Sequence, residues 1–192
     1  MKFASAIGGL LALSISLLPV AAFAQDSGAV GSTGSPLPDQ PYTLIYPQAM
    51  VTGGDQLGGP VTINHSEMPL QCILAVIPVE DTEWTADGAL SSLDAASVAE
   101  GWSDTLPGFT LGTSLVTNYQ SGPALQYEGT SAGSDTAPAT TLVHTETVAT
   151  GNGYTLDCLY PTEVATNARP IVDAIIANFS TQQDADPITA FP

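Results

Sequence analysis

Residues 154–179 read YTLDCLYPTEVATNARPIVDAIIANF, and the spacing of the apolar side chains changes within this stretch. From Tyr154 to Tyr160, alternate side chains are apolar or aromatic, as in a strand with one buried face. From Ile171 to Phe179, apolar residues recur with the spacing of one helix stripe. A helix with one apolar stripe needs a partner to pack on. We therefore predict that the chain between residues 40 and 180 forms one antiparallel sheet with this helix packed across it.

Short apolar or alternating runs bounded by Gly and Pro predict further strands upstream. The expected strands are residues 42–46, 60–67, 70–79, 109–119, 124–129 and 140–149. The first two are expected to form a hairpin or a pair of neighbouring edge strands. The run 70–79 is apolar at both alternating sets of positions, which is typical of a central strand buried on both faces. Gly151, Asn152 and Gly153 predict a tight hairpin between the run 140–149 and the final strand.

A second helix is expected between these strands. Apolar residues from 87 to 106 follow an imperfect helical stripe, with Asp87 as the N-cap and Pro107 as the stop. Gly101 weakens this prediction, because glycine inside a helix costs about 1 kcal/mol relative to alanine. Runs of adjacent strands with few helices favour the α+β class, with an antiparallel sheet of about six to seven strands flanked by helices.

The N-terminus has the pattern of a cleavable secretory signal. Lys2 is followed by the apolar run IGGLLALSISLLPVAAFA, which ends in small residues around Phe23. The uninterrupted apolar core is shorter than the about 20 residues needed to cross a bilayer, and no cysteine follows the cleavage site to carry a lipid. We expect cleavage after Ala24, a periplasmic or secreted location, and no membrane insertion afterwards.

Length and charge limit the classes of function. The remaining chain suits one domain: a flexible leader over 25–40, the α+β domain over 41–180 and a disordered tail over 181–192. There are 19 Asp and Glu residues against two Lys and Arg, and Lys2 lies in the signal, so Arg169 is the one basic residue left. Such a surface repels phosphate backbones and anionic lipids, which excludes binding to nucleic acid or to membranes by charge. We expect a monomer whose partner is an unknown protein or small ligand.

Cys72 and Cys158 are the only cysteines, and export would place them where disulfides persist. A bond between them would tie an early strand to the last one and stabilise the fold by about 4 to 5 kcal/mol on the chain-entropy account. The alternative is a redox-active or metal-binding pair. Such thiols usually come as a closely spaced Cys-x-x-Cys, which this chain lacks.

Several short motifs agree with a known fold family. They are an aromatic strand ending in Tyr46 and Pro47, Pro-Gly-Phe at 107–109, Gly-Pro-Ala at 122–124, and GNGYTLDCLYP at 151–161 before a helix ending in Ala-Asn-Phe. In this pattern, residues 42–180 resemble the PsbP-like fold family, the α/β/α sandwich of bacterial secreted proteins and lipoproteins of the PsbP, LpqN and DcrB types. The resemblance implies a non-catalytic accessory or binding protein. It transfers no functional residue, and the paired cysteines depart from its general pattern.

A repeated His-x-Glu pattern is the strongest candidate for chemistry. His65 with Glu67, and His144 with Glu146, each place an imidazole and a carboxylate on the same face of an expected strand. If the two strands are neighbours, the four groups converge on a divalent cation such as zinc or manganese. The same residues would serve the alternative function, a metal-dependent or hydrolytic envelope enzyme. The competing interpretation is that these are solvated residues near strand ends.

No sequence motif in the chain identifies a reaction. The patterns SxxK and HExxH are absent, as are phosphate-binding loops and dinucleotide fingerprints. GTSAG at residues 129–133 matches GxSxG, but a polar segment and an expected strand follow it, not the helix of a nucleophile elbow. Trp102 is expected in the core, and Trp84 either as an exposed anchor or packed over the sheet edge. Arg169 is expected to bind a carboxylate such as Glu163 or Asp173. We therefore expect a non-enzymatic secreted accessory protein, with no cofactor, that binds its ligand across the sheet or at a sheet edge.

Overall fold

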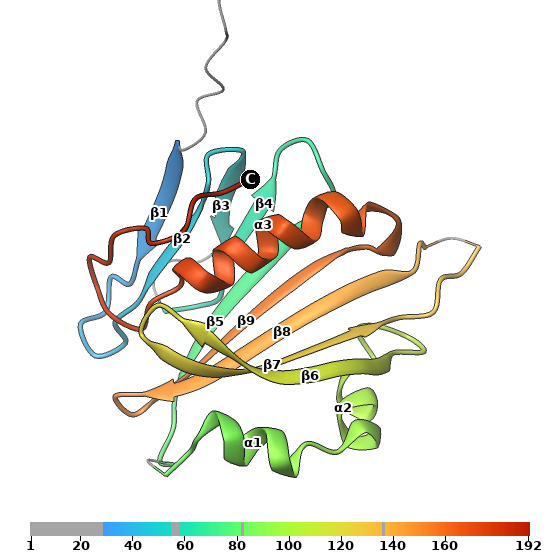
Figure 1. Ribbon diagram of the computed structural model, residues 1–192, viewed down its shortest axis with the longest axis horizontal. Coiled ribbons are helices and arrows are strands. Elements are labelled where there is room, and N and C mark those ends of the chain that lie inside the picture. Colours follow the sequence, from blue (N-terminus) through green and yellow to red (C-terminus); the bar gives the residue numbers. More distant parts are fainter. Residues whose placement is uncertain (1–28, 55–57, 82, 136) are drawn as a thin grey trace, which may run out of the picture.

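The computed structural model describes residues 29–54, 58–81, 83–135 and 137–192. One large antiparallel sheet forms its middle layer, with further elements packed on each face (Figure 1). The predicted signal peptide lies outside the described residues. Helix α3 and a small two-stranded sheet cover one face of the large sheet, and helices α1 and α2 pack on the other. The expected α+β class with a flanked antiparallel sheet is confirmed.

The large sheet has seven strands in the order β3-β4-β5-β9-β8-β7-β6, and β1 pairs with β2 in the small sheet. The strands are β1 Val30–Gly34, β2 Thr43–Pro47, β3 Met50–Gly54, β4 Val61–His65, β5 Gln71–Pro78, β6 Thr110–Tyr119, β7 Gly122–Thr130, β8 Thr140–Ala149 and β9 Asn152–Pro161. The helices are α1 Ala86–Ser92, α2 Ala95–Trp102 and α3 Ala165–Asn178, with a 3-10 turn at Thr162–Val164. Within the described residues, no helix has both the length and the apolar character needed to span a bilayer.

The predicted hairpin between β8 and β9 is confirmed, and β9 is the middle strand of the large sheet. Ala149 lies opposite Asn152, so the turn consists of Thr150 and Gly151, both with positive φ. Two successive positive φ angles are those of a type I′ turn, whose twist matches that of the flanking strands. This turn sets the register of every residue pair along the two strands.

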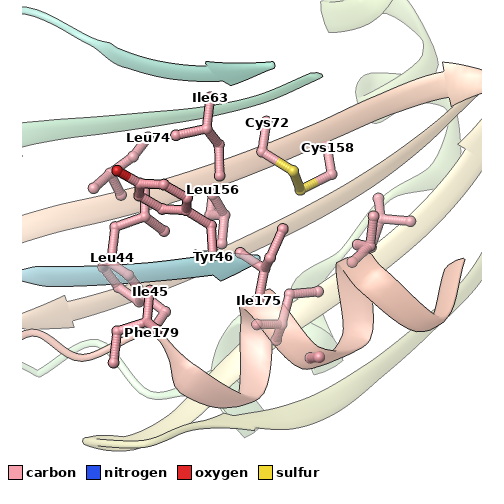
Figure 2. Close-up of a cluster of buried hydrophobic side chains, with 14 of the residues drawn as sticks. Leu44, Ile45, Tyr46, Ile63, Cys72, Leu74, Leu156, Cys158, Ile175 and Phe179 are labelled. Carbon is pink, nitrogen blue, oxygen red and sulfur yellow. A yellow bond between two sulfur atoms is a disulfide. The ribbon is translucent and has the colours of Figure 1, made fainter. Parts of the chain in front are cut away.

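The α3 face of the sheet carries the main hydrophobic core. Leu156 of β9 lies under the helix, close to Ile175 (Figure 2). Tyr160 of β9 and Val172 of α3 are buried in the same core. Cys72 and Cys158 lie directly opposite each other in β5 and β9 and form the predicted disulfide, with an S–S distance of 2.03 Å (Figure 2). The bond therefore ties an early strand to the last one, as expected.

Helix α3 begins at Ala165, six residues before the apolar stripe that starts at Ile171. Pro170 lies inside the helix, so Arg169 is in its second turn rather than at its start. The Arg169 side chain donates to Asp173 at 2.7 Å, one of its two expected partners, and also forms an ion pair with Glu128 of β7. Glu163 takes no part in these ion pairs.

The single helix expected over residues 87–106 is wrong, because the chain forms two short helices there. Thr85, not Asp87, caps α1, and its hydroxyl accepts a hydrogen bond from the Gly88 N–H. Leu93 is extended, and the Asp94 carboxylate caps α2 by accepting from the Ser97 N–H at 2.8 Å. Each cap supplies a partner to backbone donors that lack one at a helix start, so the stripe is interrupted at Leu93 and Asp94.

At its N-terminal end, the domain includes residues that the composition assigned to a flexible leader. Val30–Gly34 forms strand β1, which pairs with β2 along its whole length. A side chain at Gly31 would clash with the ring of Tyr46, at a Cβ distance of 2.4 Å, so glycine allows the ring to lie against the strand. The expected pairing of the runs 42–46 and 60–67 is therefore wrong: β2 pairs with β1, and β4 pairs with the unpredicted strand β3 and with β5.

The C-terminal segment expected to be disordered packs back onto α3. The Asn178 side-chain oxygen accepts hydrogen bonds from the backbone N–H groups of Ile188 and Thr189. Phe191 is buried and belongs to the main core. A single aromatic side chain in a polar segment thus provides the apolar contact that composition alone did not reveal.

Strand β5 is not buried on both faces, which corrects the sequence prediction. Cys72 and Leu74 point into the core under α3, but Ile77 on the opposite face is 58% exposed. Helices α1 and α2 contact β6 and β7 on the face opposite α3. Within the described chain, no helix covers this face at β3, β4 and β5. This open face adjoins the site described next.

A candidate binding groove beneath helices α1 and α2

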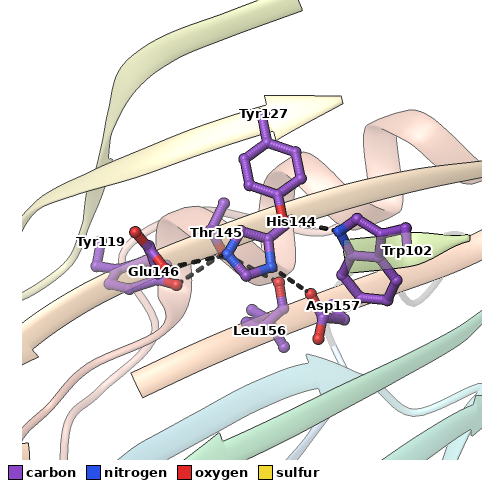
Figure 3. Close-up of polar contacts among 8 residues, drawn as sticks. All are labelled: Trp102, Tyr119, Tyr127, His144, Thr145, Glu146, Leu156 and Asp157. Atoms are coloured by element: carbon purple, nitrogen blue, oxygen red, sulfur yellow. Dashed lines mark hydrogen bonds and ion pairs between the residues drawn. The ribbon is translucent and has the colours of Figure 1, made fainter. Parts of the chain in front are cut away.

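A buried histidine lies where the helix pair meets the sheet. The register of β7, β8 and β9 places His144 between Tyr127 and Asp157. Its Nδ1 lies 2.6 Å from a carboxylate oxygen of Asp157, and its Nε2 lies 3.4 Å from Glu146 of its own strand (Figure 3). Both ring nitrogens are therefore engaged.

Two aromatic side chains enclose the His144 ring. Tyr127 stacks on it with a centroid distance of 4.3 Å, and Trp102 of α2 presents an edge at 6.3 Å. The Trp102 indole N–H donates to the Tyr127 hydroxyl at 2.9 Å (Figure 3). Trp102 is partly buried and packs against the core between α2 and the sheet, and its hydrogen bond holds the ring that covers His144.

Burial alone would lower the pKa of His144, but the hydrogen bonds to Asp157 and Glu146 outweigh it and raise the pKa to about 9. The imidazole is therefore protonated at neutral pH, with a carboxylate at each nitrogen. Burial also raises the pKa of Tyr127 to about 12, so its hydroxyl stays neutral. A protonated imidazole with both N–H groups bonded has no lone pair for a metal and none to act as a general base.

The structure does not bring the two His-x-Glu pairs together. β5 and β9 lie between β4, which carries His65, and β8, which carries His144. The register aligns Ile63 with Cys72, Cys158 and Val143, so His65 is on the α3 face and His144 on the other. His65 accepts a hydrogen bond from the Glu67 N–H at 3.2 Å, and the Glu67 side chain is exposed. Within the described residues, no group of three or more His, Cys, Asp or Glu side chains is placed to hold a metal ion.

A groove of about 560 Å³ runs between α1, α2 and the sheet beside this histidine. Its apolar lining comes from Trp84, from Leu93 between the two helices, from Val98 of α2 and from Leu125 of β7. Trp84 precedes α1 and is half-buried, so it has both a packed and an accessible part. A volume of this size suits a small molecule or a few side chains of a peptide.

Carboxylates surround the groove. Asp81, Glu83 and Asp94 line it on the helix side, and Glu146, partly exposed, lines it on the sheet side. Hydrogen bonds from Ser97 lower the pKa of Asp94, which keeps it ionised. Among the described residues, Arg169 is the one Lys or Arg side chain, and it is on the opposite face with Glu128. His144 is therefore the one cationic side chain near the groove.

Trp84 connects the groove to two neighbouring hollows. One of about 150 Å³ includes Ile77 and Glu146, and another of about 310 Å³ includes Ser121 and Thr147. The groove thus continues toward the open face of β5. The two predicted positions for Trp84, an anchor or a residue packed over the sheet, are combined in one half-buried side chain.

Sequence reasoning identified His144 and Glu146 but missed Asp157 and Tyr127 beside them. A signal for Asp157 was present, because a two-residue turn at Thr150 and Gly151 places residue 144 opposite residue 157. Tyr127 had no such signal, since the segment between β7 and β8 is too long to set a register by turn type.

No protein-family model matches the sequence, and no curated protein matches it. Solved structures do match, at low sequence identity. The cyanobacterial PsbP protein CyanoP from Synechocystis aligns with a TM-score of 0.54 and 14% identity, over 80% of this chain and 92% of its own. LpqN from Mycobacterium tuberculosis, involved in cell envelope biogenesis, aligns with a TM-score of 0.50 and 15% identity, over 85% and 92%. The Saccharomyces cerevisiae Ran-binding protein Mog1p aligns with a TM-score of 0.53 and 9% identity, over 81% and 97%.

Proposed function

Given its PsbP-like fold, we propose that this protein is a non-enzymatic accessory protein of the extracytoplasmic space that binds a basic segment of a partner protein. The segment lies in the groove beneath α1 and α2. One observation carries the proposal: Trp84 and an apolar lining are combined there with four carboxylates and no Lys or Arg side chain of the described chain.

The lining suits a lysine or arginine side chain better than a bare ion. The aliphatic stem of such a side chain can lie against Leu93 and Val98, while its charged end reaches Asp94 or Glu83. The face of Trp84 attracts the same cation through its ring quadrupole, a contact worth about 0.5 to 2 kcal/mol. The formal net charge of −17 also raises the rate at which a cationic partner arrives.

Two further features support a binding role outside the cytoplasm. His144 has both nitrogens bonded to carboxylates and lies under two aromatic rings, so it lacks the free nitrogen that a hydrolytic mechanism would need. The disulfide and the N-terminal signal pattern suit an oxidising compartment. Among the similar structures, Mog1p is a Ran-binding protein and LpqN is involved in cell envelope biogenesis, which agrees with a binding role at the envelope.

The proposal is tested by titrating the protein with a tetra-arginine peptide at low ionic strength, using calorimetry and tryptophan fluorescence. Glu83→Gln with Asp94→Asn removes two charges from the groove, and Asn keeps the α2 cap because it is as good an N-cap as Asp. Glu163→Gln with Asp186→Asn removes two exposed charges elsewhere and is the matched control. We expect the groove variant to bind about tenfold more weakly and the control to change by less than about twofold.

A third variant, Trp84→Leu, keeps the charge and removes the ring, and we expect about a fivefold weaker affinity. Equal weakening in the groove variant and the matched control would mean attraction to the net charge alone. That result, or an absence of binding in the unsubstituted protein, would overturn the proposal.

A further inference from the structure

The two edges of the large sheet differ in how they are protected. Edge strand β3 has five residues, two of them glycines at its end. Edge strand β6 has ten residues, with no proline and no charged side chain. The uncharged stretch is longer still, because no charged or histidine residue occurs between Asp104 and Glu128. Soluble proteins usually protect a long edge with charges, proline, a bulge or a covering segment.

Little of that protection is present on β6. Its irregularity lies between Leu111 and Thr113, near the start, so the pairing with β7 is regular from Thr113 to Tyr119. β7 is the one strand beside it, and nothing pairs with its outer side among the described strands. Leu115 is 43% exposed, and Thr113, Ser114 and Asn118 are exposed as well.

The strand is held in place by both helical layers. α1 and α2 contact β6 from one face, and α3 contacts it from the other. Tyr119 at its end is buried, packs edge-on against Phe179 at a centroid distance of 4.6 Å, and donates to the Thr145 hydroxyl at 2.7 Å. An incoming strand would meet an edge that is already formed, so little conformational entropy is lost on this side.

We propose that the outer edge of β6, from Thr113 to Asn118, accepts an extended segment of a different protein as an eighth strand. Backbone hydrogen bonds supply the affinity, and alternate side chains of the added strand pack beside Leu115 on one face and Val116 on the other. The paired part of that segment is uncharged and β-branched, because a charge there would find no opposite charge on β6.

The charge of the whole chain decides against a second copy as the occupant. Two copies would bring a formal charge of −17 against another of −17, whereas a segment with lysines flanking its paired part is attracted. No residue of β6 lines the groove of Trp84 and Asp94, and the inference does not depend on the function proposed for that groove.

The test uses the full protein and two synthetic peptides with the same alternating Thr-Val centre, one flanked by lysines and one by glutamates. Amide hydrogen exchange is followed by NMR. The Lys-flanked peptide is expected to slow exchange of outward β6 amides between Thr113 and Asn118 by about tenfold or more, and the Glu-flanked peptide to have no effect.

Thr113→Lys with Leu115→Lys introduces two charges on the edge and should abolish this protection. Val51→Lys with Ile188→Lys is the matched control, since it adds the same charge at exposed positions away from β6, including one on the other edge. The control should keep the protection, and a thermal unfolding curve checks that each variant is folded.

Three results would overturn the inference. They are an absence of β6 protection with the Lys-flanked peptide, protection that persists in the β6 double variant, and β6 protection that arises without peptide and grows with protein concentration. The last would identify a second copy of the chain as the occupant, and light scattering would then report a dimer.

Discussion

The two faces of the large sheet are made by alternate residues of the same strands, yet they bury different kinds of side chain. Under α3, the strands supply Leu156, Tyr160 and the Cys72–Cys158 bond to a closed hydrophobic core. Under α1 and α2, they supply His144 between two carboxylates, and part of this face stays open. The α3 face therefore stabilises the fold, whereas the face under α1 and α2 (the helix-pair face) keeps charge and accessible apolar surface.

The difference follows from what covers each face. α3 packs together with β2 and the returning C-terminal segment, so the α3 face is sealed along most of its length. α1 and α2 are short and contact mainly β6 and β7. A short cover leaves polar groups at its margin in reach of water, where a charged cluster costs less than in a closed core.

Breaking the disulfide should have the largest effect, on the α3 face. Replacing both Cys72 and Cys158 by Ala removes a link between residues 86 apart in the sequence, and the loss of its chain-entropy contribution should lower the free energy of unfolding by about 4.5 kcal/mol. Urea denaturation measures it. Reducing the unsubstituted protein should give a loss of similar size, and a loss below about 1 kcal/mol would show that the α3 face is stable without the link.

On the helix-pair face, the corresponding substitution is His144→Gln, which removes the cation between Asp157 and Glu146. Removing the cation leaves Asp157 and Glu146 without their charged partner in a half-buried position, with an expected cost of about 3 kcal/mol in the free energy of unfolding. His65→Gln is the control, because that histidine lies at a strand end and, within the described residues, its ring accepts a single hydrogen bond, from the Glu67 backbone N–H. Its effect should stay within about 0.5 kcal/mol, and equal losses in the two variants would contradict the comparison.

The dependence of stability on pH sharpens this contrast. The pKa of His144 is raised from the ordinary value of 6.5 to about 9 in the folded chain, so its contribution is complete below pH 6.5 and is lost as pH rises through 9. The loss should approach about 3 kcal/mol near pH 9.5, before tyrosine ionisation adds its own effect. Urea denaturation across this range should show a steep decline in the unsubstituted protein and a flatter one in His144→Gln. Parallel curves would show that His144 is not the group responsible.

The smallest effect is expected for Arg169→Gln, which removes the ion pairs on the α3 face. The Arg169 side chain is 32% exposed and its partner Asp173 is 54% exposed, so solvent screens the interaction and the cost should be about 1 kcal/mol. Adding about 1 M salt should reduce the difference between the two proteins. A loss above about 3 kcal/mol would place this ion pair among the main stabilising contacts of the core.

Sequence patterns were reliable where a local rule determined the outcome. The change of apolar spacing after Tyr160 predicted β9 and α3, and the glycine-rich turn predicted the pairing of β8 with β9. Composition was less reliable at the ends of the domain. Val30–Gly34 and Phe191 lie in polar, glycine-rich or proline-rich segments, and a strand partner or a core position supplies what their neighbours in sequence lack.

The sequence predicted only part of the candidate site, because the site is assembled from segments that are far apart in the chain. The His-x-Glu pattern marked His144, but its partners Asp157 and Tyr127 are on other strands, and the groove depends on where α1 and α2 pack. Predicting one long helix over residues 87–106 concealed Asp94, whose role as the second N-cap places its carboxylate beside the groove.

The sequence by itself determined the α+β class, the β8–β9 hairpin, the pairing of the two cysteines and the strongly acidic charge, because each depends on local spacing or on counts. The tertiary structure alone decided that His65 and His144 lie on opposite faces, that β5 is exposed on one face and that β6 ends the sheet as an uncharged edge. These features depend on strand order and on which helix covers which face. Both are set by contacts between residues far apart in the chain, which local patterns do not encode.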